Sequence, residues 1–250
     1  MSETVKVENI SVYYDHHPAI QNISFSSEKG ILTGVIGPNG AGKSTLMKAL
    51  LGLEKTTGGN IEVLGEKVEK VRKKLAYVPQ RSDIDWDFPV LVEDVVLMGR
   101  YAHLPWYKKI GKNEKKKARE ALEKVGMESY SKRQIGELSG GQQQRVFIAR
   151  ALVQDAEIFF LDEPFVGIDV KSEEIIINLL RNLKGNGKTI FVIHHDLSKV
   201  ESYFDNLLLI NQKLIAYGPS QEVYDPERLS EAYKGSLHLF SDEKVMVVGN

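Results

Sequence analysis

The sequence predicts an α/β fold with a parallel sheet, an antiparallel β subdomain at the N-terminus and an inserted α-helical subdomain. Three observations lead to this prediction. Short apolar strands at residues 31–36, 158–161 and 189–194 alternate with amphipathic helices, which is typical of a parallel sheet. The first 25 residues show broken period-two alternation, which favours antiparallel strands. Strand signals are scarce over residues 81–154, where helical patterns dominate.

Four helices are predicted, over residues 43–51, 114–125, 139–153 and 171–184. Gly52 supplies a stop signal after the first helix. In the second, Ala118, Leu122 and Val125 form one apolar stripe opposite a solvated Lys/Glu face. The chain is therefore expected to form one domain over residues 1–250, with the helical subdomain inserted at about 81–154.

The composition limits the classes of protein to which the chain can belong. It has 250 residues, of which 42% are hydrophobic, enough to bury a full core. The 33 Lys and Arg balance 34 Asp and Glu, which argues against a broad nucleic-acid-binding surface. No cysteine is present, so disulfides are excluded. The start lacks a secretory signal and the apolar runs are too short to span a bilayer, so any membrane part is expected from another chain.

A glycine-rich segment between the predicted strand at 31–36 and helix at 43–51 fits the pattern GxxxxGK[ST]. Glycines let the backbone curl so that its N–H groups point at phosphate oxygens, and the following helix adds its positive end. Lys43 is expected to reach the β- and γ-phosphates, and the Ser44 hydroxyl to bind Mg²⁺. The predicted residues that bind the nucleoside triphosphate here are Gly37, Pro38, Asn39, Gly40, Ala41, Gly42, Lys43, Ser44 and Thr45.

Two carboxylates, Asp162 and Glu163, end the apolar strand at 158–161. Neighbouring residues on a strand face opposite ways, so the two can have different roles. Asp162 fits support of Mg²⁺, and Glu163 fits polarisation of an attacking water. A strand end carrying ordinary surface acids is the alternative; the preceding phosphate-binding pattern favours the catalytic interpretation.

The run Leu138 to Arg145 contains Ser139, a good helix N-cap, followed by paired glycines that leave backbone N–H groups uncovered. With the two motifs above, nearly the whole chain resembles the ATP-binding subunits of ATP-binding-cassette (ABC) transporters, whose core is a P-loop NTPase (RecA-like) fold. The resemblance implies a homodimer in which this loop contacts ATP held by the other copy. The residues implied in that contact are Ser139, Gly140, Gly141, Gln142 and Asp169.

The resemblance assigns further roles. Tyr14 stands where an aromatic ring stacks on adenine, with Tyr13 expected on the opposite strand face. Gln80 matches a glutamine that senses Mg²⁺, so the implied Mg²⁺ ligands are Ser44, Gln80 and Asp162. His195 matches a histidine that contacts the γ-phosphate. The implied catalytic residues are Glu163, His195, Gln80 and Lys43.

A closer resemblance is to the branch that serves manganese, zinc and iron importers. It depends on four segments, at residues 78–81, 85–89, 94–101 and 231–239. Lys234-Gly235 departs from the Gly-Gly that the branch usually has. The segment at 85–89 is expected near a groove that receives a helix of the membrane subunit, with Trp86 near that groove and Phe88 partly in the core.

The resemblance thus implies an ATPase subunit, using ATP and Mg²⁺, of a divalent-metal importer. Its implied partners are a second copy, membrane permease subunits and, through the permease, a metal-binding protein; nucleic acid is not among them. Its implied place is cytoplasmic, at the inner face of the cell membrane. A soluble ABC ATPase of metal-cluster assembly or repair is the alternative. A P-loop kinase or GTPase would leave residues 139–142 unexplained.

Overall fold

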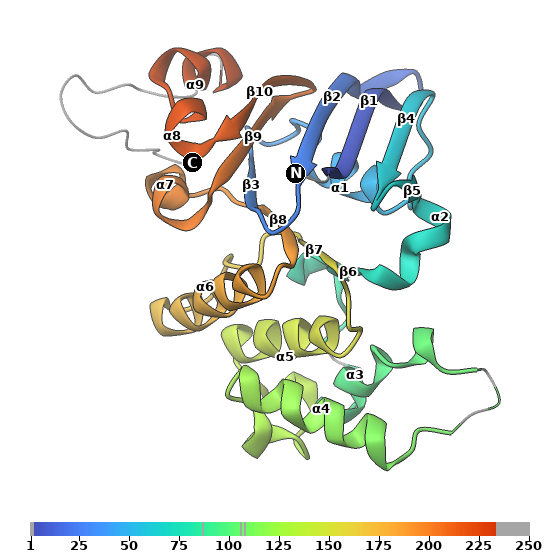
Figure 1. The fold of residues 1–250 in the computed structure, drawn as a ribbon. Helices are drawn as coiled ribbons and strands as arrows, with labels where there is room; N and C mark the ends of the chain where they lie inside the picture. The colour runs from blue at the N-terminus through green and yellow to red at the C-terminus, as the bar shows by residue number, and fades with distance from the viewer. Residues whose placement is uncertain (1–2, 87, 106, 108, 234–250) are drawn as a thin grey trace. The chain divides into compact units, whose positions relative to one another are not determined.

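The computed structural model describes residues 3–86, 88–105, 107 and 109–233. Asp87 and the tail residues 234–239 singled out above lie outside that range. The chain divides into two compact units, each considered by itself: unit 1 comprises residues 1–72 and 189–250, and unit 2 comprises residues 73–188 (Figure 1). Within the described ranges, no helix combines the length and apolarity that crossing a bilayer demands.

Unit 1 begins with the predicted antiparallel strands. The sheet has the order β2-β1-β4-β5. Its strands are β1 (Glu3–Tyr14), β2 (His17–Glu28), β4 (Gly58–Val63) and β5 (Glu66–Lys67). β1 is one strand whose pairing with β2 shifts register between Val7 and Ile10, and Asn9 between them has φ 51°. This irregularity explains why the period-two pattern looked broken in the sequence.

The second set of strands in unit 1 is mainly parallel, as predicted. β3 (Leu32–Ile36) lies between β8 (Thr189–Ile193) and β9 (Asn206–Asn211) and is parallel to both. β10 (Lys213–Pro219) pairs with β9 in the antiparallel sense. β3 and β8 are buried along their whole length, as expected for strands covered on both faces.

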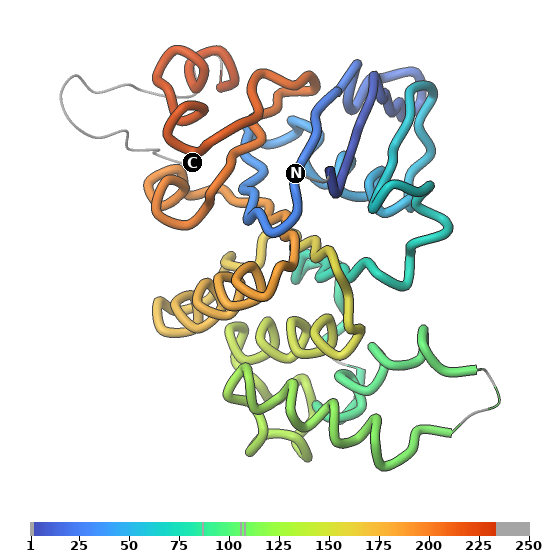
Figure 2. Tube along the Cα trace, viewed as in Figure 1, coloured from blue at the N-terminus to red at the C-terminus, as the bar shows by residue number. Residues whose placement is uncertain are grey.

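Short helices complete unit 1. α1 follows β3, and the chain then returns into β4 beside β1 (Figure 2). α8 and α9 pack against β9 and β10. The helices are α1 (Lys43–Leu50), α2 (Val68–Val71), α7 (Val200–Tyr203), α8 (Ser220–Val223) and α9 (Pro226–Tyr233). The described part of the tail segment, Glu231 to Tyr233, belongs to α9.

Unit 2 combines two parallel strands with a helical region. β6 (Leu75–Val78) pairs in parallel with β7 (Ile158–Leu161), which spans the predicted residues. Its helices are α3 (Val92–Met98), α4 (Lys112–Lys124), α5 (Gly140–Leu152) and α6 (Val170–Gly185). Each predicted helix is present, with ends that differ by two residues at most. α3, α4 and α5 pack on one another, and the named elements described between residues 81 and 154 are all helical.

Candidate functional site

The glycine-rich loop of unit 1 connects the end of β3 to the start of α1. Gly37 has φ 154°, and a Cβ there would lie 2.1 Å from the carbonyl oxygen of Ile210 in β9. Gly42 has φ 90°, and a Cβ there would lie 2.5 Å from the carbonyl oxygen of Ala19 in β2. Side chains are therefore excluded at both ends of the loop, because its backbone runs directly against neighbouring backbone.

Lys43 is the first residue of α1, and its side chain reaches back to this loop. Its ammonium donates to the carbonyl oxygens of Gly37 and Pro38, each at 2.8 Å, and the residue is only 6% exposed. The loop is also held from outside, since the backbone N–H of Gln212 in the β9–β10 turn donates to the Ala41 carbonyl at 2.9 Å. The arrangement puts a cation and the positive end of α1 at one loop, which suits a bound anion.

Tyr14 lies at the end of β1. Partial burial raises the pKa of its phenol, Glu54 adds to the rise, and a hydrogen bond with Thr45 in the first turn of α1 opposes it. Tyr13 and Tyr14 are 44% and 45% exposed, and a register shift precedes Tyr13. The two rings are therefore equally exposed, although strand alternation predicted opposite faces. The hydrogen bond with Thr45 is what favours Tyr14 as the candidate ligand-binding ring.

The two histidines after β8 differ in their surroundings. His194 is buried, and its ring packs against Tyr203 and Phe204 at centroid distances of 5.9 and 5.5 Å. His195 is half-buried. Asp196 then turns the chain by accepting hydrogen bonds from the backbone and hydroxyl of Ser198. His194 is thus a core residue, and His195 is the member of the pair that is more accessible to a ligand.

In unit 2, Asp162 follows directly on β7 and is almost completely buried, with 2% exposed. Its backbone N–H continues the sheet by donating to the Val78 carbonyl at 2.9 Å. The Tyr77 hydroxyl donates to its Oδ2 at 3.4 Å. Burial and the nearby Asp162 charge both raise the pKa of Tyr77, so this phenol remains a neutral donor.

Glu163 has an unusual backbone conformation. Its φ is 50°, a left-handed value that costs a residue with a side chain about 1–3 kcal/mol and is typical of functional positions. Its Oε2 accepts a hydrogen bond of 2.8 Å from Nε2 of Gln80. Two residues that the sequence assigned to catalysis are therefore in direct contact. The sequence did not predict this hydrogen bond, because it joins the ends of two different strands.

The start of α5 is capped as predicted. The Ser139 backbone N–H donates to Oε1 of Gln142 at 2.9 Å, and the Gln142 backbone N–H donates to Oγ of Ser139 at 3.4 Å. This reciprocal capping box satisfies backbone groups at the helix start. It also fixes the two residues on either side of Gly140 and Gly141.

Asp169 is the N-cap of α6 and lies beside the start of α5. Its carboxylate accepts the Ser172 backbone N–H at 2.9 Å and the Ser172 hydroxyl at 2.8 Å. These two hydrogen bonds lower the pKa of Asp169. A Cβ on Gly141 would lie 2.5 Å from the Ser172 Oγ and 3.1 Å from the Asp169 Oδ2. The structure therefore brings the start of α5 and Asp169 together, through a contact that only glycine permits.

An apolar groove of about 220 Å³ lies between the segment after Gln80 and the helices α3 and α5. The Trp86 ring packs edge-on against Phe147 with centroids 5.1 Å apart. Phe88 is 59% exposed, so the expectation that it lies partly in the core is wrong. It lines the groove instead. The lining residues are Ile84, Asp85, Trp86, Phe88, Val90, Val95, Met98, Ile135, Phe147 and Arg150.

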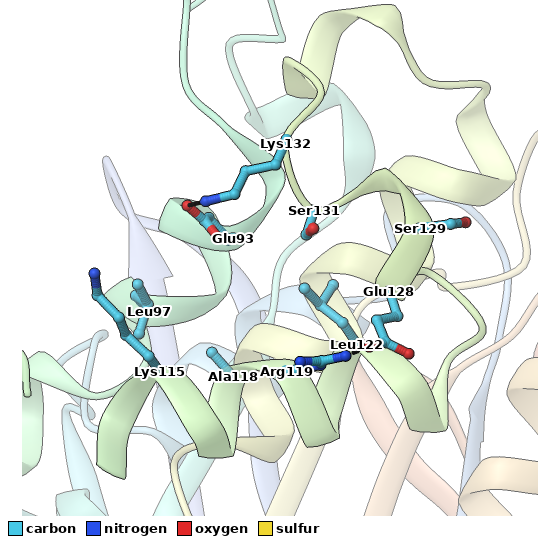
Figure 3. Close-up of a pocket in the computed structure, with 10 residues that line it drawn as sticks. All are labelled: Glu93, Leu97, Lys115, Ala118, Arg119, Leu122, Glu128, Ser129, Ser131 and Lys132. Carbon is cyan, nitrogen blue, oxygen red and sulfur yellow. Dashed lines mark hydrogen bonds and ion pairs between the residues drawn. The ribbon is translucent and has the colours of Figure 1, made fainter. Parts of the chain in front are cut away.

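A second cavity of unit 2, about 540 Å³, lies between α3, α4 and the turn after α4 (Figure 3). Its lining includes the apolar side chains of Leu97, Ala118 and Leu122. Lys132 pairs with Glu93, and Arg119 pairs with Glu128 at 2.6 Å. Two of the cations in its lining are thus neutralised by neighbouring acids. None of the residues that the sequence assigned to ATP or Mg²⁺ lines this cavity.

Residues 20–166 match the family described as ABC transporter. The chain is 64% identical over 249 residues to the manganese transport system ATP-binding protein MntB of Halalkalibacterium halodurans, covering 99% of both chains. It is 50% identical to the zinc transport system ATP-binding protein TroB of Treponema pallidum, covering 93% of this chain and 88% of the relative.

Among solved structures, a nucleotide-free ATP-binding cassette from an ABC transporter superposes with a TM-score of 0.81 at 28% identity, covering 92% of this chain and 98% of that one. The ADP conformation of another such cassette, MJ1267, gives 0.78 at 29% identity, covering 94% of this chain and 100% of that one. The family match, the 64% identity over almost the whole length and the similar fold together show that the chain belongs to the ABC transporter family.

Proposed function

We propose that the protein is the ATP-hydrolysing subunit of an importer for a divalent metal ion, manganese, zinc or iron. The observation that carries this proposal is the 64% identity to a manganese transport ATP-binding protein over 99% of both chains. A zinc transport relative at 50% identity supports a metal ion as the cargo but leaves the choice of metal to other subunits.

ATP is assigned to the glycine-rich loop. The backbone N–H groups of the loop glycines and of the start of α1 would donate to its phosphate oxygens. Lys43 would exchange its two loop carbonyl partners for phosphate oxygens, which is a small movement for a side chain already in the loop. Tyr14 would stack on the adenine, and its link to Thr45 supports that assignment.

Mg²⁺ is assigned to Ser44, Gln80 and Asp162. A hydroxyl, an amide oxygen and a carboxylate are the hard oxygen donors that Mg²⁺ prefers, and Asp162 is a buried carboxylate fit to carry such a charge. When bound, the ion would neutralise phosphate charge. The Gln80 amide nitrogen is directed to Glu163, which leaves its amide oxygen as the candidate ligand.

Glu163 is assigned as the group that takes a proton from water as the water oxygen attacks the γ-phosphorus, with ADP leaving. A positioned base contributes about 10²- to 10⁴-fold to rate. The Gln80 amide holds one carboxylate oxygen of Glu163 at 2.8 Å, so it orients the base. His195 would donate to a γ-phosphate oxygen.

A second copy is assigned to complete each site. Ser139, Gly140, Gly141 and Gln142 would present the capped start of α5 to ATP on the partner. Asp169, joined to this point through Ser172, would lie at the seam between the copies. ATP would favour the closed dimer because it contacts both copies only when they are closed, and that differential affinity shifts the population.

A membrane permease is assigned to the apolar groove. Trp86, the exposed Phe88 and Met98 offer a surface of the size and character that a short amphipathic helix can fill. The protein would then lie on the cytoplasmic face of the cell membrane. A metal-binding protein would act through the permease, and nucleic acid would take no part.

The test is co-reconstitution with the copurifying permease in vesicles, followed by ATP-dependent uptake of Mn²⁺, Zn²⁺ and Fe²⁺. We expect uptake of at least one of these ions that requires hydrolysable ATP. A purified complex containing only soluble proteins, with no membrane partner, would contradict the proposal and favour an ATPase of metal-cluster assembly.

A further inference from the structure

We propose that Arg81 is a positioning residue that couples occupation of the apolar groove to the start of α5, and so makes ATP hydrolysis depend on the permease. The inference deepens the proposed function and rests on its assignment of the groove to a permease. All the contacts that carry it lie within unit 2.

The first contact joins Arg81 to α5. Nε and Nη2 of Arg81 both donate to Oε1 of Gln143, at 3.2 and 3.0 Å. Gln143 is 3% exposed, and its Nε2 donates to the Ile135 carbonyl at 3.2 Å, so its amide orientation is fixed. The guanidinium is therefore anchored to a rigid point in the first turns of α5.

The second contact places the guanidinium against Gly140. A Cβ on Gly140 would lie 2.8 Å from Nη1 of Arg81 and 3.0 Å from its Cζ. A Cβ on Gly167 would lie 3.8 Å from Nη1. The planar end of Arg81 thus lies over the glycine that follows the Ser139 cap, beside the loop that leads to Asp169.

The third contact joins Arg81 to the groove. Its guanidinium carbon lies 5.8 Å from the centre of the Trp86 ring, within the range of a cation–π interaction. Its backbone carbonyl accepts the Trp86 indole N–H at 2.9 Å. Trp86 lines the apolar groove and also a neighbouring cavity of about 380 Å³ that contains Gln80, Arg81 and Glu163. A helix that displaces this ring would therefore displace Arg81.

These contacts make Arg81 one member of a short chain of packed groups. It starts at the groove with Trp86, passes through the guanidinium, and ends at Gly140 and Gln143. Arg81 also follows Gln80, whose amide holds Glu163. Arginine suits this position because its planar fork can meet an acceptor, a ring and a glycine backbone at once, whereas lysine has a single charged point.

The test measures ATP hydrolysis by each variant with the permease, in the reconstituted complex, and without it, as the isolated subunit. The stimulation ratio is the first rate divided by the second. Arg81→Met keeps the length of the side chain without its charge and fork. Arg133→Met is the matched control, since Arg133 lies on the same unit and makes a cation–π contact with Tyr130 at 4.9 Å. Coupling between sites typically changes a response by about 5- to 150-fold.

We expect the stimulation ratio of Arg81→Met to fall by about fivefold or more, with uptake falling in parallel, while permease binding and the ratio of Arg133→Met stay at wild-type values. Gln143→Met should produce a similar loss. The double variant should lose little more than either single variant, because both break the same link.

A wild-type stimulation ratio in Arg81→Met would overturn the inference, as would independent, multiplying losses in the double variant. Loss of permease binding in Arg81→Met would also overturn it, because Arg81 would then belong to the docking surface itself. A failure of the proposed function is distinguishable, since it would appear in the wild-type complex as absent uptake or absent permease binding.

Discussion

Gly141→Ala should destabilise the protein, against the usual effect of replacing glycine by alanine in a helix. The new Cβ would lie 2.5 Å from the Ser172 Oγ and 2.9 Å from the Ser172 Cβ. Ser172 is 4% exposed and its hydroxyl is held by Asp169 at 2.8 Å, so it cannot turn away without losing that bond. The helices α5 and α6 must separate locally instead.

The size of the effect follows from two opposing contributions. Overpacking of this kind costs about 1–3 kcal/mol, and alanine regains about 0.5–1 kcal/mol of helix stability. A net loss of about 1–2 kcal/mol lowers Tm by roughly 2–8 °C in a protein of this size. Thermal unfolding followed by circular dichroism measures the shift.

Gly185→Ala is the matched control, because Gly185 is a helical residue of α6 where an added Cβ would meet no atom within 4 Å. Its Tm should equal or exceed that of the wild type. Ser172→Gly in the Gly141→Ala background should recover part of the loss, a coupling of about 0.5–3 kcal/mol. A Gly141→Ala protein as stable as Gly185→Ala would refute the proposed contact between the two helices.

Glu163→Gln should lower kcat for ATP hydrolysis about 10²- to 10⁴-fold, measured by phosphate release, while ATP titration shows unchanged affinity. Unchanged turnover would show that Glu163 is not the base that takes the proton from water. Burial opposes ionisation of Asp155, yet the hydrogen bond from Lys117 at 2.6 Å and nearby cations hold its pKa below the usual value. Its stabilising effect is therefore present above the unfolded pKa of about 3.9 and lost as pH falls through the lower folded value. The Tm deficit of Asp155→Asn should accordingly shrink in acid, and a deficit independent of pH would contradict this. Phe88→Ser should weaken permease binding by roughly tenfold or more without changing the hydrolysis rate of the isolated subunit. The control is Leu53→Ser, because Leu53 is 61% exposed but belongs to unit 1, and this variant should bind the permease like the wild type. Equal binding by both variants would exclude Phe88 from the docking surface.

Elements with strong local signals were predictable from the sequence. β7 was predicted residue for residue because an apolar run ends abruptly at two acids. The start of α5 was predicted because Ser139 is a favoured N-cap, and the structure shows the capping box it forms with Gln142. The parallel arrangement of β3 with β8 also agrees with the alternation of strands and helices.

Features that depend on contacts between distant segments were not predictable. The Gln80–Glu163 hydrogen bond and the position of Arg81 over Gly140 join residues from separate elements, and no local pattern encodes such contacts. The register shift at Asn9 concealed a continuous strand. Phe88 was assigned to the core because it is aromatic, but its surroundings leave it exposed.

The most direct test of the account is ATP-dependent Mn²⁺ uptake into permease vesicles that contain either wild-type protein or Glu163→Gln, at equal permease occupancy. We expect sustained uptake with the wild type and uptake about 10²- to 10⁴-fold slower with the variant. Sustained uptake by the variant at the wild-type rate, or none by the wild type with any of the three metals, would contradict the claim that hydrolysis through Glu163 drives metal import.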